Sequence, residues 1–249
     1  MWRKIRLAFA LLSRIPIRAS GDLKGLPPNE AVPFFVLVGY AVGLTYWILL
    51  HLTRILHLFP PVAILLVMAV VYYLFDLFHF DGLLDTLDGF LCQKNREERL
   101  RIMKKGNVGP FGFFYGFIFL LAQFYLLSSL AVNPWLLFLT GPFSRWSLVL
   151  LLSFSRPAKE EGLAVICYPV LPRAFFWATV TLLPVIIFMP LLSAIALFST
   201  IVITLLVRNA SGRIIGGVTG DVLGALCLLS ELAVLFGFSI LINFKGLAF

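Results

Sequence analysis

The fold of this chain is decided by residues 60–89, which read PPVAILLVMAVVYYLFDLFHFDGLLDTLDG. The first two thirds of the stretch form an apolar run close to the roughly 20 residues that a helix needs to cross a bilayer. The last third carries three aspartates within eight residues. The stretch therefore predicts a membrane-spanning helix whose end presents a cluster of carboxylates.

Apolar runs of this kind recur along the 249 residues, of which 61% are hydrophobic and only 13% are charged. A soluble domain carries about a quarter charged residues. We therefore expect one integral membrane domain over residues 1–249, an all-α bundle of about seven transmembrane helices preceded by an N-terminal interfacial helix. Pro184 and Pro190 allow another interpretation of the fifth and sixth spans, a broken hairpin that does not cross fully. The expected spans are 32–55, 60–80, 110–131, 134–154, 173–190, 192–207 and 221–243.

The distribution of positive charge predicts the orientation of the bundle. Seventeen of the 20 Lys and Arg residues fall in connections on one side of the expected membrane. The positive-inside rule then places these connections and the N-terminus in the cytoplasm, with the C-terminus outside, for a multi-pass protein of the cell inner membrane. The net charge of +8 does not indicate nucleic-acid binding, because the basic residues lie in short loops with few interleaved aromatic residues. The three cysteines show no spacing typical of a disulfide framework or a zinc site.

The three aspartates at the end of the second span, Asp81, Asp85 and Asp88, fall within about 60° of one another on a helix. Carboxylates on one stripe repel each other, and a divalent cation would relieve that repulsion. A donor set made only of oxygens favours Mg²⁺ or Mn²⁺ over zinc. The alternative is three solvated aspartates at a frayed helix end. Gly82 and Gly89 flank the stripe and suggest close approach by a neighbouring helix or a substrate.

Other polar residues of the spans lie deeper. His79 and Asp76 point away from the aspartate stripe, which favours a packed histidine and a structural ion pair over metal ligation. Arg145 and Glu231 each lie about 15 Å from the cytoplasmic face. Lone charges at that depth are costly, so we predict that they pair between the fourth and seventh spans, with Asp76 as the alternative partner. The competing interpretation is that each charge lines a separate wet cavity.

Two further stretches are rich in glycine and lie on the same predicted side. Residues 212–225 form a glycine-rich loop leading into a helix N-terminus, an arrangement that suits phosphate binding. Asp221 at that position is either a helix cap or a fourth metal-facing carboxylate. Residues 101–112 combine three cations with regularly spaced glycines. They are interpreted either as a flap over an anionic substrate or as an ordinary basic loop.

Together these stretches resemble the cobalamin synthase family, the adenosylcobinamide-GDP ribazoletransferases. The family's histidine followed by Asp-Gly-x-x-Asp-x-x-Asp-Gly is matched by residues 79–89, and its Arg-x-Met stretch is similar to residues 101–112. Its Gly-Gly-x-Thr-Gly-Asp-x-x-Gly-Ala, with a glutamate about ten residues on, is matched by 216–225 and Glu231, and its early Arg-x-Pro by 14–16. Two departures are Lys105, where the family usually has aspartate, and residues 156–163, which fit only loosely.

The resemblance implies that a hydroxyl of α-ribazole, or of its 5′-phosphate, attacks the cobinamide-side phosphorus of adenosylcobinamide-GDP and that GMP leaves. It implies one or two Mg²⁺ ions, with Mn²⁺ as the alternative, and one of the ligating carboxylates could instead orient or deprotonate the hydroxyl. The expected catalytic and metal-ligating residues are Asp81, Asp85, Asp88 and Asp221. The expected substrate-binding residues are Arg14, Arg101, Lys104, Gly109, Gly112, Arg213, Gly217, Thr219 and Gly220. The lipid bilayer is the expected surrounding, and a homo-oligomer or a complex with other corrinoid-assembly enzymes is compatible with the sequence.

Two other classes of protein place carboxylates on membrane helices. A CDP-alcohol phosphotransferase would have alanine and arginine after the first Asp-Gly-x-x and a longer spacing between its aspartates, and both are absent here. A cation transporter would use intramembrane carboxylates along its path. Only Asp76 and Glu231 lie deep, and no acidic residue lies in the outer half of the expected spans.

Overall fold

The computed structural model describes residues 1–17, 25–162 and 164–245, and these residues form an all-helical bundle. Within this described part, six helices are long and apolar enough to cross a membrane. They are η2–α2 (Pro28–Phe34 and Phe35–Ile55), α3–η3–α4 (Pro60–Val71, Tyr72–Asp76 and Leu77–Leu91), α6 (Pro110–Leu130), α7 (Pro134–Phe154), α10 (Pro190–Ile214) and α11 (Gly220–Lys245). The shorter elements are α1 (Trp2–Leu12), α5 (Arg96–Lys104), η4 (Val165–Cys167), α8 (Pro172–Val180) and α9 (Leu183–Phe188).

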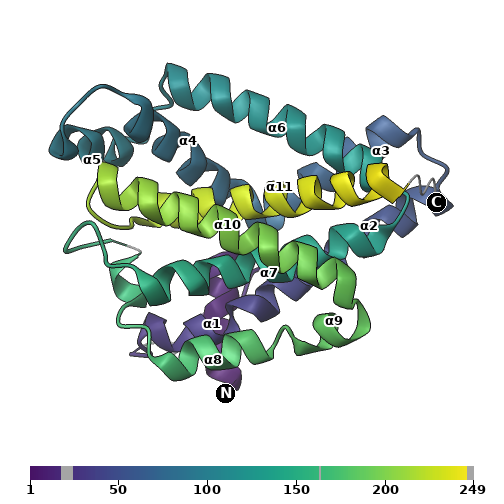
Figure 1. Ribbon diagram of the computed structural model, residues 1–249, viewed down its shortest axis with the longest axis horizontal. Helices are drawn as coiled ribbons and strands as arrows, with labels where there is room; N and C mark the ends of the chain where they lie inside the picture. The colour runs from purple at the N-terminus through teal and green to yellow at the C-terminus, as the bar shows by residue number, and fades with distance from the viewer. Residues whose placement is uncertain (18–24, 163, 246–249) are drawn as a thin grey trace.

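The fifth expected span, 173–190, differs from the others because it consists of two short helices, α8 and α9. Pro184 lies in the first turn of α9, where its missing N–H and its ring prevent α8 from continuing. Pro190 starts α10, which is unbroken over 25 residues, so the sixth expected span is a full-length helix. The pair α8–α9 leads from the end of the bundle near α5 to the end where α10 begins (Figure 1).

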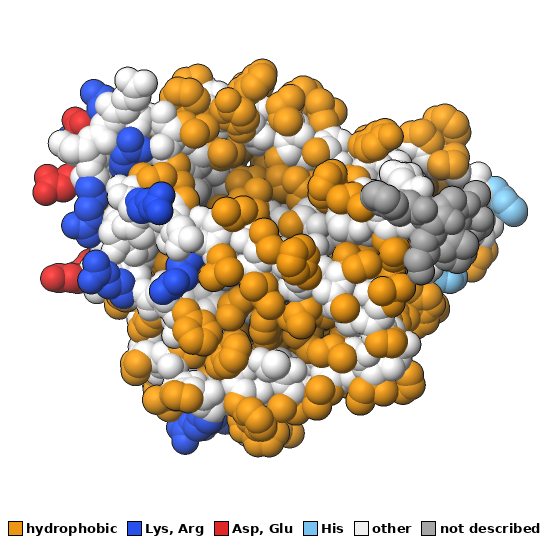
Figure 2. All heavy atoms as spheres, viewed as in Figure 1, with side chains coloured by type: hydrophobic (Ala, Val, Ile, Leu, Met, Phe, Trp, Pro, Cys, Tyr) orange, Lys and Arg blue, Asp and Glu red, His pale blue; other side chains and the backbone are white. Residues whose placement is uncertain are grey.

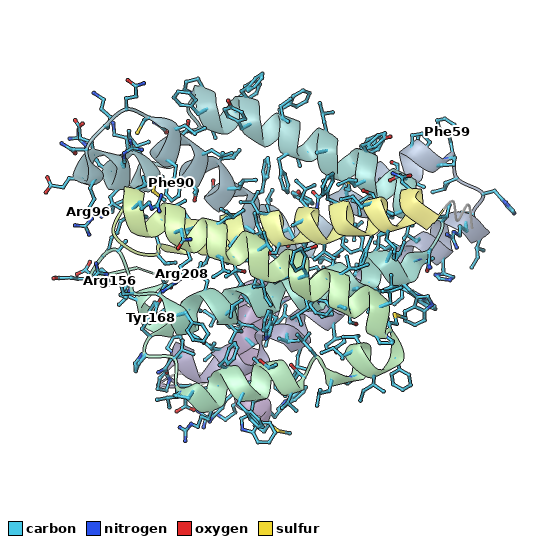
Figure 3. All side chains as sticks on the ribbon, in the orientation of Figure 1. Phe59, Phe90, Arg96, Arg156, Tyr168 and Arg208 are labelled. Carbon is cyan, nitrogen blue, oxygen red and sulfur yellow. The ribbon has the colours of Figure 1, made fainter. Side chains whose placement is uncertain are left out.

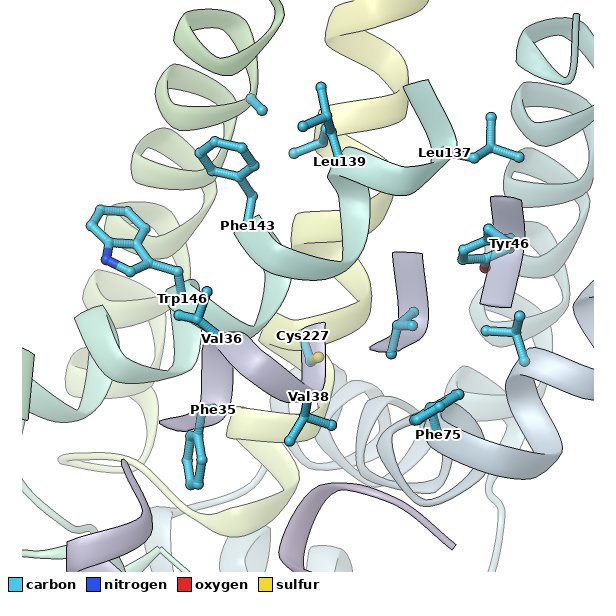
Figure 4. Close-up of a cluster of buried hydrophobic side chains, with 14 of the residues drawn as sticks. Phe35, Val36, Val38, Tyr46, Phe75, Leu137, Leu139, Phe143, Trp146 and Cys227 are labelled. Carbon is cyan, nitrogen blue, oxygen red and sulfur yellow. The ribbon is translucent and has the colours of Figure 1, made fainter. Parts of the chain in front are cut away.

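The core is built around α7, the most deeply buried of the six long helices. Helix α2 packs against it backbone to backbone, since a methyl group added at Gly43 would overlap the carbonyl of Phe138. Buried side chains from α2, α7 and α11, among them Tyr46, Phe143 and Cys227, fill the space between these helices (Figure 4). Large apolar side chains such as those of α6 and α10 remain exposed around the bundle, as expected of a surface that faces lipid (Figure 2).

The charged residues gather at one end of the bundle. Most of the Lys, Arg, Asp and Glu side chains on the face shown in Figure 2 lie at the end that holds α5. The described residues of 155–171 and the connection 215–219 lie at this same end, which we call the charged end. The short connections 56–59 and 131–133 lie at the opposite end (Figure 1). The prediction that the polar and glycine-rich stretches share one side is therefore confirmed. The cytoplasmic orientation of that side stays a prediction.

Thiol labelling will test this orientation. In a Cys92→Ser background, which removes the half-buried cysteine of the charged end, we expect Glu97→Cys to react with an impermeant maleimide only after the cells are permeabilised. Val132→Cys, in an exposed position of the opposite connection, should react in intact cells. Labelling of Glu97→Cys from outside would invert the topology.

Candidate functional site

A cavity of about 790 Å³ opens at the charged end of the bundle. It lies between α4, the start of α11, the end of α5 and residues 159–162, 164 and 165 of the connection after α7. Six residues expected from the sequence to form the site line it together: Asp81, Asp85, Lys104, Thr219, Gly220 and Asp221. The cavity therefore brings residues of all three stretches singled out in the sequence, 79–89, 101–112 and 212–225, into one site.

Two glycines bring the two acidic helices together. A methyl group added at Gly82 would lie 2.9 Å from the carbonyl oxygen of Asp221, and one added at Gly224 would lie 3.1 Å from the backbone of His79. A Cβ at Gly82 would force α4 and α11 apart, and one at Gly224 would be tighter than nearly all real contacts, so glycine at both positions favours this close approach. The close approach predicted for Gly82 is confirmed, and its partner is α11.

The approach of the helices gathers negative charge. Asp85 is 7% exposed and interacts electrostatically with Asp221, Asp81 and Asp88, which repel it, and with Lys159, which attracts it. Asp81 is exposed, and Asp221 is half-buried. Like charges this close in a partly desolvated site are unfavourable unless a cation joins them.

Thr219 determines how Asp221 is presented. The backbone N–H of Val222 donates to Oγ1 of Thr219 at 3.3 Å, so Thr219 caps the N-terminus of α11. The Thr219 hydroxyl in turn donates to Oδ2 of Asp221 at 3.3 Å. Because the capping role falls to Thr219, the carboxylate of Asp221 is left facing the cavity.

Asp88 has other partners. Its Oδ2 accepts the N–H of Gly109 at 2.7 Å, and its Oδ1 accepts the N–H of Gly112 at 2.9 Å. Any Cβ on either glycine would collide with this carboxylate. The glycines of the 101–112 stretch are thus needed for the approach of Asp88 to the start of α6, and Asp88 does not line the cavity. Its expected metal ligation stays a prediction.

Four of the other predicted residues lie outside the cavity. Arg101 is 70% exposed and pairs with Glu98 of α5 at 3.7 Å. Arg14 stacks over the ring of Tyr73 at 4.8 Å and lines a separate groove of about 540 Å³ that also includes Asp81. Arg213 and Gly217 line a different cavity, on the other side of the turn before α11.

Sequence reasoning missed the contribution of residues 157–162. Lys159, Glu160 and Glu161 line the cavity, and Lys159 lies near both Asp85 and Asp221. They are placed there because the segment 156–158 pairs with 216–218 through a short bridge between Pro157 and Val218. No local sequence pattern predicts this pairing. The run of three charges in a short connection was the one signal that these residues could have a function.

A buried ion network lies deeper in the bundle. Arg145 of α7 donates through Nη1 to Glu231 of α11 and through Nη2 to Asp76. All three side chains are almost completely buried, and Ser144 also donates to Glu231 at 3.3 Å. The prediction that the fourth and seventh spans touch through Arg145 and Glu231 is confirmed, and Asp76 joins the pair. The interpretation with separate wet cavities is wrong for these charges.

His79 lies beside this network and not in the cavity. It is buried, as the sequence predicted, and its side chain and those of Asp76 and Cys227 come within 4.8 Å of one another. Arg145, which pairs with Asp76, carries a positive charge that would repel a metal cation bound by this group. We therefore interpret this group as part of the packed core.

The chain resembles proteins of one named family over almost its whole length. Residues 4–239 match the family model described as cobalamin-5-phosphate synthase. A protein of Thermosipho africanus named adenosylcobinamide-GDP ribazoletransferase is 41% identical, covering 92% of this chain and 94% of that protein. Proteins of the same name from Fervidobacterium nodosum and Kosmotoga olearia are 39% and 37% identical, covering 94% and 97% of this chain and 95% and 100% of those proteins. No solved structure matches the chain.

The ion network predicts a specific pattern of stability. Arg145→Met leaves two buried carboxylates without their cationic partner, which costs about 3–5 kcal/mol and should lower the thermal midpoint in detergent by about 10 °C. The triple variant Asp76→Asn/Arg145→Met/Glu231→Gln should recover part of that loss, because it removes the unpaired charges. Arg54→Gln, at an exposed arginine that donates to the carbonyls of Ala131 and Val132, is the control. Equal midpoints for Arg145→Met and Arg54→Gln would contradict the assignment.

Proposed function

The chain belongs to the cobalamin-5-phosphate synthase family, and we propose that it transfers the adenosylcobinamide-phosphate group from adenosylcobinamide-GDP to α-ribazole or its 5′-phosphate. A hydroxyl of the acceptor attacks the cobinamide-side phosphorus, the bond from that phosphorus to the bridging oxygen breaks, and GMP leaves. The observation that carries the proposal is the cavity in which Asp81, Asp85 and Asp221, from two helices far apart in sequence, meet Lys104 and Lys159.

The donor set of the cavity fits a hard divalent cation. Asp81, Asp85 and Asp221 offer only oxygen ligands, and no cysteine or histidine is among the described residues that line the cavity. We propose that these three aspartates hold Mg²⁺, with Mn²⁺ as a substitute. A divalent cation bound there would neutralise charge on the phosphate oxygens during transfer. For Asp88 we propose a structural role at the start of α6 in place of the metal ligation predicted from the sequence, because its oxygens accept two N–H groups there and it does not line the cavity.

The remaining residues of the cavity suit binding and orientation of a diphosphate. Lys104 and Lys159 supply positive charge to the cavity, and Gly220, which also lines it, begins α11, whose N-terminus favours an anion. The attacking hydroxyl loses its proton to one of the carboxylates. A volume of about 790 Å³ is that of a small-molecule site, so the cavity accommodates the diphosphate and its immediate neighbours while the bulky corrinoid extends outside.

The buried charges argue against a cation path through the bundle. Asp76 and Glu231, the acidic residues that lie deepest, are both bonded to Arg145. A carboxylate paired with a guanidinium is a poor relay for a metal cation. The family membership also separates the chain from CDP-alcohol phosphotransferases.

The cell inner membrane is the proposed location, with the cavity facing the cytoplasm. The six long apolar helices make the chain a multi-pass membrane protein. The basic residues gathered at the charged end favour a cytoplasmic position for that end. Nucleotide-activated substrates and GMP are cytoplasmic compounds, which agrees with this orientation.

Single carboxamide substitutions test the assignment of the aspartates. We expect Asp85→Asn and Asp221→Asn each to lower turnover by at least about a hundredfold, since each removes a charge that the transition state needs. Turnover is measured with purified protein as release of GMP from adenosylcobinamide-GDP in the presence of α-ribazole. The control is Glu97→Gln, an exposed acidic residue of α5 at the same end of the molecule. Activity near the wild-type level in both aspartate variants would exclude the site.

The metal requirement is tested separately. Chelation with EDTA should abolish turnover, and Mg²⁺ or Mn²⁺ but not Zn²⁺ should restore it, because the donors are all carboxylates. Binding of Mn²⁺, followed by its paramagnetic signal, should weaken in Asp221→Asn and persist in Asp88→Asn. Full turnover in EDTA would rule out the metal requirement. The transferase activity itself would still be tested by GMP release.

A further inference from the structure

A second cavity, of about 480 Å³, lies at the charged end between the end of α7, the end of α10 and the turn 216–218. Three arginines line it: Arg156 follows α7, while Arg208 and Arg213 belong to the last turns of α10. Figure 3 shows Arg156 and Arg208 at the same end of the molecule, although they come from different elements. We call this space the arginine cavity.

A backbone wall separates the arginine cavity from the carboxylate cavity. The N–H of Val218 donates to the carbonyl of Arg156 at 2.9 Å, and the N–H of Ala158 donates to the carbonyl of Val218 at 2.9 Å. Val218 is the one described residue that lines both cavities. These two hydrogen bonds close the wall between the aspartates and the arginines.

The charge of the arginine cavity is uncompensated within the described part of the chain. None of the described residues lining it is Asp or Glu, and none of its three arginines has a carboxylate within ion-pair distance there. The side chains are nonetheless held in place: Nε of Arg208 donates to the carbonyl of Phe154 at 2.7 Å, and Nε of Arg156 donates to the carbonyl of Gly216 at 3.3 Å. Each of these bonds uses Nε, so the terminal nitrogens remain available to donate to an anion.

The position of the cavity indicates where the anion comes from. Directly before Arg208, α10 exposes Leu205 and Leu206, which are 47% and 60% exposed, and Phe154 beside the cavity is 55% exposed. Arg156 and Arg208 lie at the charged end (Figure 3), next to these exposed apolar side chains. Cations at this boundary are well placed for the headgroups of a leaflet.

We propose that the arginine cavity binds the phosphate of an anionic phospholipid whose acyl chains lie along the exposed apolar side chains of α10 and along Phe154. An anionic lipid, a free phosphate and a nucleotide could all be bound here in the same way, through a phosphate held by guanidinium groups. The adjoining apolar surface favours the lipid, because only a lipid occupies both surfaces at once. This site goes beyond the proposed transferase function and does not depend on it.

Lipid binding to the intact, delipidated protein in detergent tests the proposal. Binding of dioleoylphosphatidylglycerol is measured by native mass spectrometry for the wild type, Arg208→Gln, Arg156→Gln and the control Arg54→Gln. We expect the first two variants to bind about tenfold more weakly, as for loss of a charged hydrogen bond, and the control to bind like the wild type. Arg208→Lys, which keeps the charge, should retain more affinity than Arg208→Gln. Monodisperse elution and an unchanged thermal midpoint establish that each variant is folded.

Competition distinguishes the sources of phosphate. Inorganic phosphate or GMP at about 10 mM should not displace the bound lipid, and dioleoylphosphatidylcholine should bind more weakly than the anionic lipid. Equal affinity of Arg156→Gln, Arg208→Gln and Arg54→Gln for the anionic lipid would overturn the proposal. Displacement by inorganic phosphate, without any preference for the anionic lipid, would overturn the lipid assignment. Arg156→Gln still decides the matter if Arg208→Gln does not fold, because Arg156 makes only one long bond to the backbone.

Discussion

The buried guanidinium of Arg145 is the contact on which the rest of the structure depends. It binds Asp76 at the start of α4 and Glu231 in α11, so three helices meet at one charge inside an apolar bundle. A charge in that place is costly unless it is paired, which leaves these helices one favourable register. Asp85 lies nine residues from Asp76, and Asp221 lies ten residues from Glu231. At 1.5 Å per residue both carboxylates therefore stand roughly 14–15 Å from the same guanidinium, at one depth.

Depth alone would not bring the carboxylates together, and the lateral approach of the helices comes from glycine. Gly82 and Gly224 allow α4 and α11 to touch backbone to backbone, while the π-helical turn Tyr72–Asp76 adjusts the register of α4 just before its acidic stripe. On the other side of α4, Asp88 ties the start of α6 down through two N–H groups. The acidic stripe is thus divided by its surroundings: one aspartate fastens a neighbouring helix, and the others face the cavity.

Much of this arrangement could be predicted from sequence. Membrane helices are recognised by their length and hydropathy, and helical periodicity determines which side chains share a face. The stripe, the packed His79 and the pairing of Arg145 with Glu231 all follow from such local rules and from the cost of a lone charge in lipid. What could not be predicted depends on contacts between distant segments. The place of Lys159 in the site requires the pairing of 156–158 with 216–218, and the separation of Arg213 from the aspartates requires the same wall. Neither has a periodic signature.

The wall also explains why the turn before α11 contains glycines, which the sequence motif alone does not explain. A methyl group added at Gly217 would lie 2.6 Å from the carbonyl oxygen of Arg156, and Gly216 adopts a φ of 79°, which favours glycine. These glycines are needed for the tight pairing of two segments, and phosphate binding is not required to explain them.

The wall formed by this pairing has carboxylates and lysines on one face and arginines on the other. Opposite charges on the two sides would keep the proposed divalent cation and the proposed lipid phosphate apart, since each would be repelled by the other's site. A single short bridge at Pro157 and Val218 therefore separates two kinds of chemistry at one end of the bundle.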